Sequence, residues 1–136
     1  MSFRNLSILL FACFVFTSCE EDKLAKYEGI WEGAYIGDEE GTWKIRIQDN
    51  GVSEGVAYPS GNEGDQSFVF VGSVNEEGEL VMSATVFGRV AIYEAFLTET
   101  DLSGSWSDEE GDFSGTWSGT KRKQEDQFPY GLLLNP

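Results

Sequence analysis

The chain has 136 residues and a formal net charge of −15, with 24 acidic residues against 9 lysines and arginines. Nucleic acid and anionic lipid both repel such a surface, so the charge argues against either as a partner. The chain also has no histidine, which excludes Ser-His-Asp and Cys-His nucleophilic sites and removes the commonest zinc ligand. We therefore expect a protein that is not an enzyme and that holds no cofactor and no metal.

The first 18 residues have the pattern of a secretory signal peptide. Arg4 is their only charge, and residues 6–16 form an apolar run that is short for a membrane span. The segment Phe16-Thr17-Ser18-Cys19 resembles the lipobox of bacterial lipoproteins, although leucine is usual at the place of Phe16. The resemblance implies that Cys19 becomes the acylated first residue of the mature chain. The alternative is an ordinary signal peptide that is cleaved elsewhere and leaves Cys19 as a free thiol.

An acidic stretch at residues 20–22 follows Cys19 directly. It resembles the surface-export signature of some outer-membrane lipoproteins, and the alternative is a solvated tether. We expect an outer-membrane protein that is anchored by lipid and exposed at the cell surface. Because Cys13 leaves with the signal, no disulfide is expected in the mature domain. The expected parts are a signal peptide (1–18), an acidic tether (19–28), a β-barrel domain (29–120) and a C-terminal tail (121–136).

From residue 29 onward, apolar and polar residues alternate in short segments, as they do in half-buried strands. Residues 42–48 show this most clearly, and Asn50-Gly51 after them is a strong hairpin signal. No segment has helical periodicity long enough to cross a sheet, so the strands are expected to pair antiparallel. The expected strands are 31–36, 42–48, 52–58, 66–74, 79–86, 90–97, 102–107 and 112–120.

We predict that these strands form an eight-stranded antiparallel up-and-down barrel, closed by the first strand with the last. Closure removes two exposed sheet edges. Each of the four tryptophans follows a glycine by two residues, and closure makes the four strands that carry these tripeptides contiguous. The tripeptides begin at Gly29, Gly41, Gly104 and Gly115. The alternative is an open sandwich or a five-stranded OB-like barrel with additional hairpins.

Alternation also predicts which side chains fill the barrel. An eight-stranded barrel encloses a space that is filled by side chains or holds one small ligand. The expected inward residues are mostly large, so we expect a filled interior with at most a shallow pocket. They are Trp31, Tyr35, Trp43, Ile45, Ile47, Val56, Tyr58, Phe68, Phe70, Leu80, Met82, Ile92, Phe96, Leu102, Trp106, Phe113 and Trp117.

Glu54 and Glu94 share the apolar parity of their strands. Two inward carboxylates could act as acid and base, as in glycoside hydrolysis. A shift of register would place both outside, and we favour the non-catalytic interpretation because small filled barrels rarely offer a substrate cleft.

In a meander the turns alternate between the two ends, so four turns gather at the end far from the N-terminus. These turns are mostly acidic. Carboxylate oxygens suit Ca²⁺, but the spacing is not that of an EF-hand, and we expect solvated turns that bind a partner. The expected partner-binding residues are Asp38, Glu39, Glu40, Asn62, Glu63, Asp65, Arg89, Asp108, Glu109 and Glu110.

The tail combines a basic cluster at residues 121–123 with an apolar segment at 128–134. We expect the apolar segment to fold back over an end of the barrel or over a groove outside it. A partner-binding peptide is the alternative.

Gly29-Ile30-Trp31 resembles the Gly-x-Trp signature of lipocalins and related calycin barrels, which implies a cup for a small apolar ligand. At the level of the fold only, the chain resembles the small lipoprotein peptidase inhibitors called potempins. We expect a monomeric, non-catalytic, protein-binding surface lipoprotein, specifically an inhibitor of a secreted or host peptidase. The alternative is a lipocalin-like carrier of a small apolar ligand.

Overall fold

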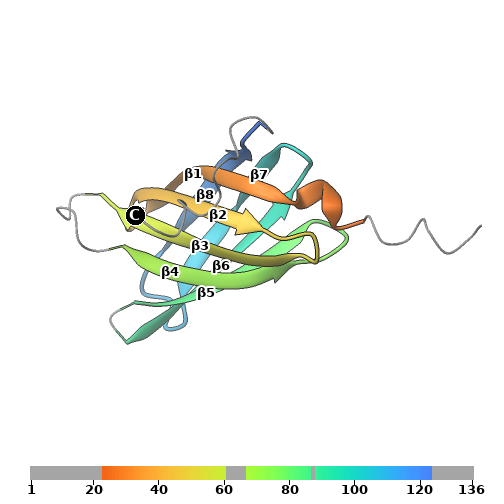
Figure 1. The fold of residues 1–136 in the computed structure, drawn as a ribbon. Coiled ribbons are helices and arrows are strands. Elements are labelled where there is room, and N and C mark those ends of the chain that lie inside the picture. The colour runs from red at the N-terminus through yellow and green to blue at the C-terminus, as the bar shows by residue number, and fades with distance from the viewer. Residues whose placement is uncertain (1–22, 61–66, 87, 124–136) are drawn as a thin grey trace, which may run out of the picture.

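The computed structural model describes residues 23–60, 67–86 and 88–123, which form a short 3₁₀ helix and eight strands (Figure 1). Every strand begins and ends within two residues of the expected range. The elements are η2 (Ala25–Tyr27), β1 (Gly29–Gly37), β2 (Gly41–Ile47), β3 (Val52–Pro59), β4 (Phe68–Val74), β5 (Glu79–Val86), β6 (Arg89–Leu97), β7 (Asp101–Asp108) and β8 (Ser114–Lys121).

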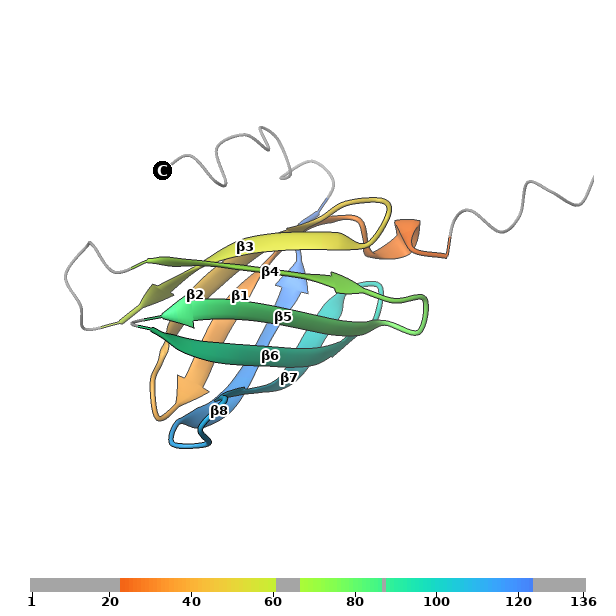
Figure 2. The same ribbon diagram turned by 90° about the horizontal axis from the view of Figure 1, so that it is seen from below.

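The strands close into a barrel in sequence order, and β8 pairs with β1 (Figure 2). All pairs are antiparallel. Gly33 of β1 lies opposite Gly119 of β8, and Tyr35 lies opposite Trp117. The prediction of a closed, eight-stranded up-and-down barrel is therefore confirmed.

The Gly-x-Trp tripeptides of β7 and β8 pair with each other in a reciprocal way. Gly104 lies opposite Trp117, and Trp106 lies opposite Gly115. A Cβ atom at Gly115 would stand 2.6 Å from Nε1 of Trp106, so the indole occupies the space that a side chain at Gly115 would need. The glycine that accommodates the Trp106 ring thus belongs to the neighbouring strand.

Each of the four indole N–H groups donates a hydrogen bond to a backbone carbonyl. These bonds fix the orientation of the rings and satisfy donors that burial would otherwise leave unpaired. The acceptors and N···O distances are Tyr27 for Trp31 (2.9 Å), Ala34 for Trp43 (3.1 Å), Ile36 for Trp106 (3.2 Å) and Glu94 for Trp117 (2.9 Å).

The middle of the barrel is filled by aromatic side chains that surround Trp117. Its ring centroid lies 5.2 Å from that of Trp43, 5.5 Å from that of Tyr93 and 6.0 Å from that of Phe70. The three contacts are edge-to-face, a favoured geometry for aromatic pairs. Most of the expected inward residues are buried, namely Trp31, Tyr35, Trp43, Ile45, Ile47, Phe70, Leu80, Met82, Leu102, Trp106 and Trp117.

The predicted parity is wrong in β3, where Val56 and Tyr58 are only half-buried. The buried positions of this strand are instead occupied by small residues, Ser53, Gly55 and Ala57. Large side chains of the adjacent strands explain this choice, since a Cβ atom at Gly55 would collide with Ile45 and Phe70. In this narrow interior, side-chain volume decides which face of β3 turns inward.

The predicted parity is also wrong in β6. Tyr93 is buried there, whereas Ile92 is half-buried and Phe96 is exposed on the outer surface. Phe113, also predicted to point inward, lies in the turn before β8 and is 42% exposed. Tyr93 extends the aromatic cluster around Trp117. The face of β6 that carries Tyr93 therefore points into the barrel, and the face that carries Ile92 and Phe96 points outward.

The same correction moves the two candidate acid–base carboxylates. Glu54 is half-buried at the outer surface, opposite Arg46 of β2, and Glu94 is exposed. They share the parity of Val56 and Phe96 and therefore point away from the interior. The geometry does not form the inward carboxylate pair.

Helix η2 closes the end of the barrel that we call proximal, at the right in Figure 1. Tyr27 is buried, its carbonyl accepts the Trp31 N–H, and a Cβ atom at Gly78 would lie 2.9 Å from its hydroxyl. Leu24 packs against the same core. Among the described residues, no helix has the length and apolar character to span a membrane.

Candidate functional site

A pocket of about 250 Å³ opens at the other end of the barrel, which we call distal. Its walls are mainly apolar, and acidic and basic side chains stand at its rim. The lining comes from strands β4 to β7, from the β1–β2 turn and from the β7–β8 turn. The lining residues are Glu39, Phe68, Val86, Arg89, Ala91, Tyr93, Trp106, Asp108 and Phe113.

Tyr93 and Trp106 form a fixed part of the wall. They lie directly opposite one another on β6 and β7, and their rings stack with centroids 6.2 Å apart and an interplanar angle of 26°. Tyr35 packs edge-on against Trp106, also with a centroid separation of 6.2 Å. The hydrogen bond from Trp106 to Ile36 holds the indole in place, so this aromatic wall is formed before any ligand arrives.

The hydroxyl of Tyr35 is buried beside this wall and has no hydrogen-bond partner among the described residues. Burial, together with the negative charge of Glu39, raises the pKa of Tyr35 to about 12. Burial, with further contributions from Tyr35 and Glu39, also raises the pKa of Tyr93. Both phenols are therefore neutral at physiological pH, and the charge of Glu39 acts on the inner side of the pocket.

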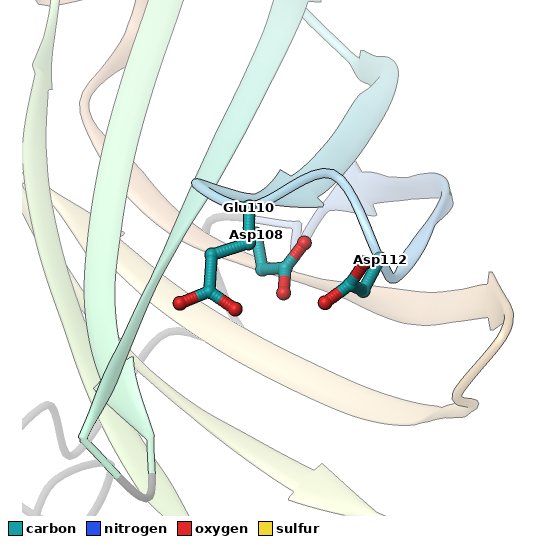
Figure 3. A group of neighbouring side chains, drawn as sticks. All are labelled: Asp108, Glu110 and Asp112. Atoms are coloured by element: carbon teal, nitrogen blue, oxygen red, sulfur yellow. The ribbon is translucent and has the colours of Figure 1, made fainter.

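Arg89 joins the two turns beside the pocket through three ion pairs. Its guanidinium lies 2.9 Å from a carboxylate oxygen of Asp108, 2.9 Å from one of Glu110 and 3.4 Å from one of Asp112. These carboxylates gather on the loop between β7 and β8 (Figure 3). Arg89 also lies over the ring of Phe113, with 5.6 Å between Cζ and the ring centroid. The ion pairs thus fix the β5–β6 turn against the β7–β8 turn.

Asp108, the last residue of β7, makes several hydrogen bonds that hold the β7–β8 turn. Burial acts to raise the pKa of its carboxyl, but hydrogen bonds from the backbone N–H groups of Phe113 and Asp112, together with Arg89, outweigh burial and lower that pKa. The Phe113 N–H lies 3.2 Å from Oδ1, and the backbone of Asp108 bonds to Phe113 and Gly111. Asp108 is therefore ionised at neutral pH and holds the turn in one conformation.

The same three carboxylates are close enough to suggest a cation site. One oxygen each of Asp108, Glu110 and Asp112 lies within 4.8 Å of the others. The guanidinium of Arg89 contacts all three and supplies the positive charge that the cluster attracts. We therefore interpret this cluster as an ion-pair network between two turns.

The structure brings most of the predicted partner-binding residues to the distal end. Asp38, Glu39 and Glu40 form the exposed β1–β2 turn. Asp38 accepts a hydrogen bond from the Ser114 N–H at 2.9 Å, which ties this turn to β8. The turns that follow β5 and β7 place Arg89, Asp108, Glu109 and Glu110 at the same end.

Several predicted residues lie outside the described part of the chain. They are Asn62, Glu63 and Asp65 of the β3–β4 link, and Cys19 with the segment 16–18. Conversely, alternation in the sequence predicts Phe68, Trp106 and Phe113 as interior residues and does not predict Tyr93 as one. All four residues line the pocket. Their position near the distal turns could have indicated that they line a pocket, because an inward aromatic residue near a strand end can reach the mouth of the barrel.

The described elements define a small closed β-barrel of eight antiparallel strands. Among solved structures, the chain is similar to a redesigned β-barrel, with a TM-score of 0.55 and 10% sequence identity. The match covers 76% of this chain and 96% of the designed one. No protein-family model matches the chain, and no curated protein matches it significantly. At this identity the similarity concerns the fold alone.

Proposed function

We propose that this protein is a non-catalytic binding module that engages another protein through its distal end. The observation that carries the proposal is the pocket formed by Tyr93 and Trp106, which opens between acidic turns. Aromatic side chains in pockets at the centre of an interface commonly provide most of the binding energy. Polar and charged residues around them form the rim that such interfaces have.

The rigidity of the rim supports this function. Arg89 joins two turns through ion pairs, and Asp38 joins a third turn to β8. A rim that is ordered before binding loses little conformational entropy on association, so more of the contact energy appears as affinity.

In its specific form, the proposal is an inhibitor of a secreted or host peptidase. The turns between the described strand ends, apart from the β3–β4 link, are short, and a barrel with short turns can occupy a peptidase while offering little loop for cleavage. A lipid on Cys19 would hold the domain at the outer membrane, and the distal end would then face away from the anchor. The protein would act there as a monomer, without a cofactor.

A second candidate function is transport of a small apolar ligand. The pocket at the barrel mouth supports it, because β-barrel mouths are frequent ligand sites and the walls here include Phe68, Val86 and Ala91. The ligand would have to be small, since the aromatic cluster around Trp117 occupies the middle of the barrel.

Capture experiments with two charge-reversal variants test the protein-binding proposal. A chain that begins at Glu20 retains every described strand and η2. Wild type and the exposed proximal variant Glu77→Lys should retain the same protein from secreted or host material. The distal variant Glu39→Lys should lose it. Equal retention by both variants, or no retained protein, contradicts the proposal.

The lipid anchor has a separate test. Cells that express the full chain should incorporate labelled palmitate into it, and Cys19→Ala should abolish both the labelling and the mature form. Unchanged processing of Cys19→Ala would contradict lipidation at this residue.

A further inference from the structure

The distal pocket has room for one long side chain. Its volume of about 250 Å³ is below the roughly 300–1,000 Å³ of pockets that bury a drug-sized ligand. Tyr93 and Trp106 stack within it, and Phe68 and Phe113 contribute further rings. The faces of aromatic rings attract cations, most strongly where water is excluded. The walls therefore favour a group that combines an apolar stem with a positive charge.

The charges at the rim favour the same group. Glu39 lines the pocket, and no hydrogen bond or ion pair with a described residue engages its carboxylate. Among the described residues of the distal turns, Arg89 is the only cation, and its guanidinium is already shared by three carboxylates. An incoming anion would meet these carboxylates and Glu39, whereas an incoming cation would be attracted by the Glu39 carboxylate at the pocket.

One contact within the rim already has this chemistry. Arg89 lies over the ring of Phe113, with 5.6 Å between Cζ and the ring centroid, so an intramolecular cation uses an aromatic face of this rim.

We infer that the distal pocket receives a lysine or arginine side chain of the protein partner, with its stem against the apolar lining of the pocket and its charge beside Glu39. The inference rests on the proposed function and specifies the chemistry of its interface. It predicts that recognition requires both the aromatic wall and the Glu39 carboxylate.

A titration with two short peptides tests the inference without the partner. The probes are a blocked glycine pentapeptide with a central lysine and the same peptide with norleucine, which keeps the four-carbon stem and lacks the ammonium group. The readout is the NMR signal of each indole N–H. Trp106 lines the pocket, whereas Trp31 lies at the closed proximal end and serves as an internal control.

The lysine peptide should shift the Trp106 signal in a saturable manner and leave the Trp31 signal in place. Its affinity should exceed that of the norleucine peptide at least about threefold, as expected for a cation–aromatic contact with a nearby carboxylate. Glu39→Gln should remove this preference, and Glu77→Gln, an equal change of charge at the proximal end, should preserve it. Both positions are exposed, so neither variant disturbs the core.

Equal affinity for the two peptides, or no shift at Trp106 at saturating concentration, overturns the inference. The capture experiment gives a separate result. A retained protein together with equal peptide affinities contradicts the lysine or arginine anchor and leaves the protein-binding proposal intact. If the lysine peptide binds more tightly at Trp106 but no protein is retained, the protein-binding proposal is contradicted. The preference of the pocket for a cationic side chain then still holds.

Discussion

The two ends of the barrel use similar aromatic residues for opposite purposes. At the proximal end, η2 covers Trp31, and the carbonyl of Tyr27 accepts its N–H. At the distal end, Trp106 is held by Ile36 in the same way, but the chain leaves a pocket beside it. A tryptophan fixed by a backbone carbonyl can thus complete a core or line a pocket, depending on whether another segment covers it.

Charge separates the two ends further. The proximal end carries charges of both signs. Lys23 pairs with Glu76 there, and the Lys121 ammonium, which is close to Glu28 and Glu99, donates a hydrogen bond to the Lys26 carbonyl. The described distal turns carry acidic residues and Arg89. If the proposed partner is basic, this difference in charge would steer it toward the distal end.

The largest loss of stability is expected from truncation of the buried tryptophans, because both ends of the barrel pack on the same core. Trp31→Ala and Trp117→Ala should each lower the free energy of unfolding by about 3–5 kcal/mol, because each leaves a large cavity. Urea unfolding measures the loss. Phe96→Ala is the matched control, since Phe96 is 67% exposed, and it should cost less than about 0.5 kcal/mol. Equal costs for Trp117 and Phe96 would contradict the assigned parity.

A smaller effect is expected from the glycine that accommodates the distal indole. In Gly115→Ala the new methyl group would collide with the Ile36 carbonyl and with Trp106. Overpacking of this kind costs about 1–3 kcal/mol, and displacement of Trp106 should also weaken binding at the pocket. Ser118→Ala, at an exposed position of the same strand, is the control for unfolding. An unchanged stability of Gly115→Ala would mean that the indole does not lie against this glycine.

The acidic side of the pH profile should distinguish the distal turn from the rest of the molecule. The pKa of Asp108 is lowered by folding from its ordinary value of 3.8, so its ionised form stabilises the folded state above that pH. The stabilisation is lost as the pH falls below it through the folded pKa. Asp108→Asn should therefore be less stable than wild type at pH 7, and the difference should shrink below about pH 4. A difference that does not vary with pH would contradict this assignment.

The smallest effect at neutral pH is expected from Tyr35→Phe. The substitution removes the buried hydroxyl without a partner, so stability at pH 7 should stay unchanged or rise by up to about 1 kcal/mol. The raised pKa means that wild type loses stability as the pH rises from 10 toward about 12, because the unfolded phenol ionises first. Tyr35→Phe should lose less over that range. An equal loss in both proteins would show that the hydroxyl is solvated.

The architecture could be predicted from the sequence because alternation indicates the strands and turn residues indicate the hairpins between them. Closure then removes the two unpaired sheet edges. The sequence predicted parity less well in β3 and β6, since alternation there offers two faces and the choice depends on the volumes of side chains from other strands. Gly55 faces inward because Ile45 and Phe70 fill the space beside it, a contact between residues that are distant in sequence.

Of the distal site, only the acidic turn residues could be predicted from the sequence. The alternation of turns in a meander is enough to gather Asp38, Glu39 and Glu110 at one end. The ion pairs of Arg89 with Asp108 and Asp112 depend on how two turns from different hairpins approach each other. Whether an inward aromatic residue is covered or accessible also depends on the strand ends, and alternation within a strand carries no information about that.

Site-specific photocrosslinking tests most directly whether recognition occurs at the open end. A photoreactive residue would replace Glu39 in one protein and Glu77 in another, because both are exposed and lie at opposite ends. The captured partner should crosslink at position 39 and not at position 77. Crosslinking at position 77 alone, or with equal efficiency at both positions, would contradict the assignment of the distal end as the binding face.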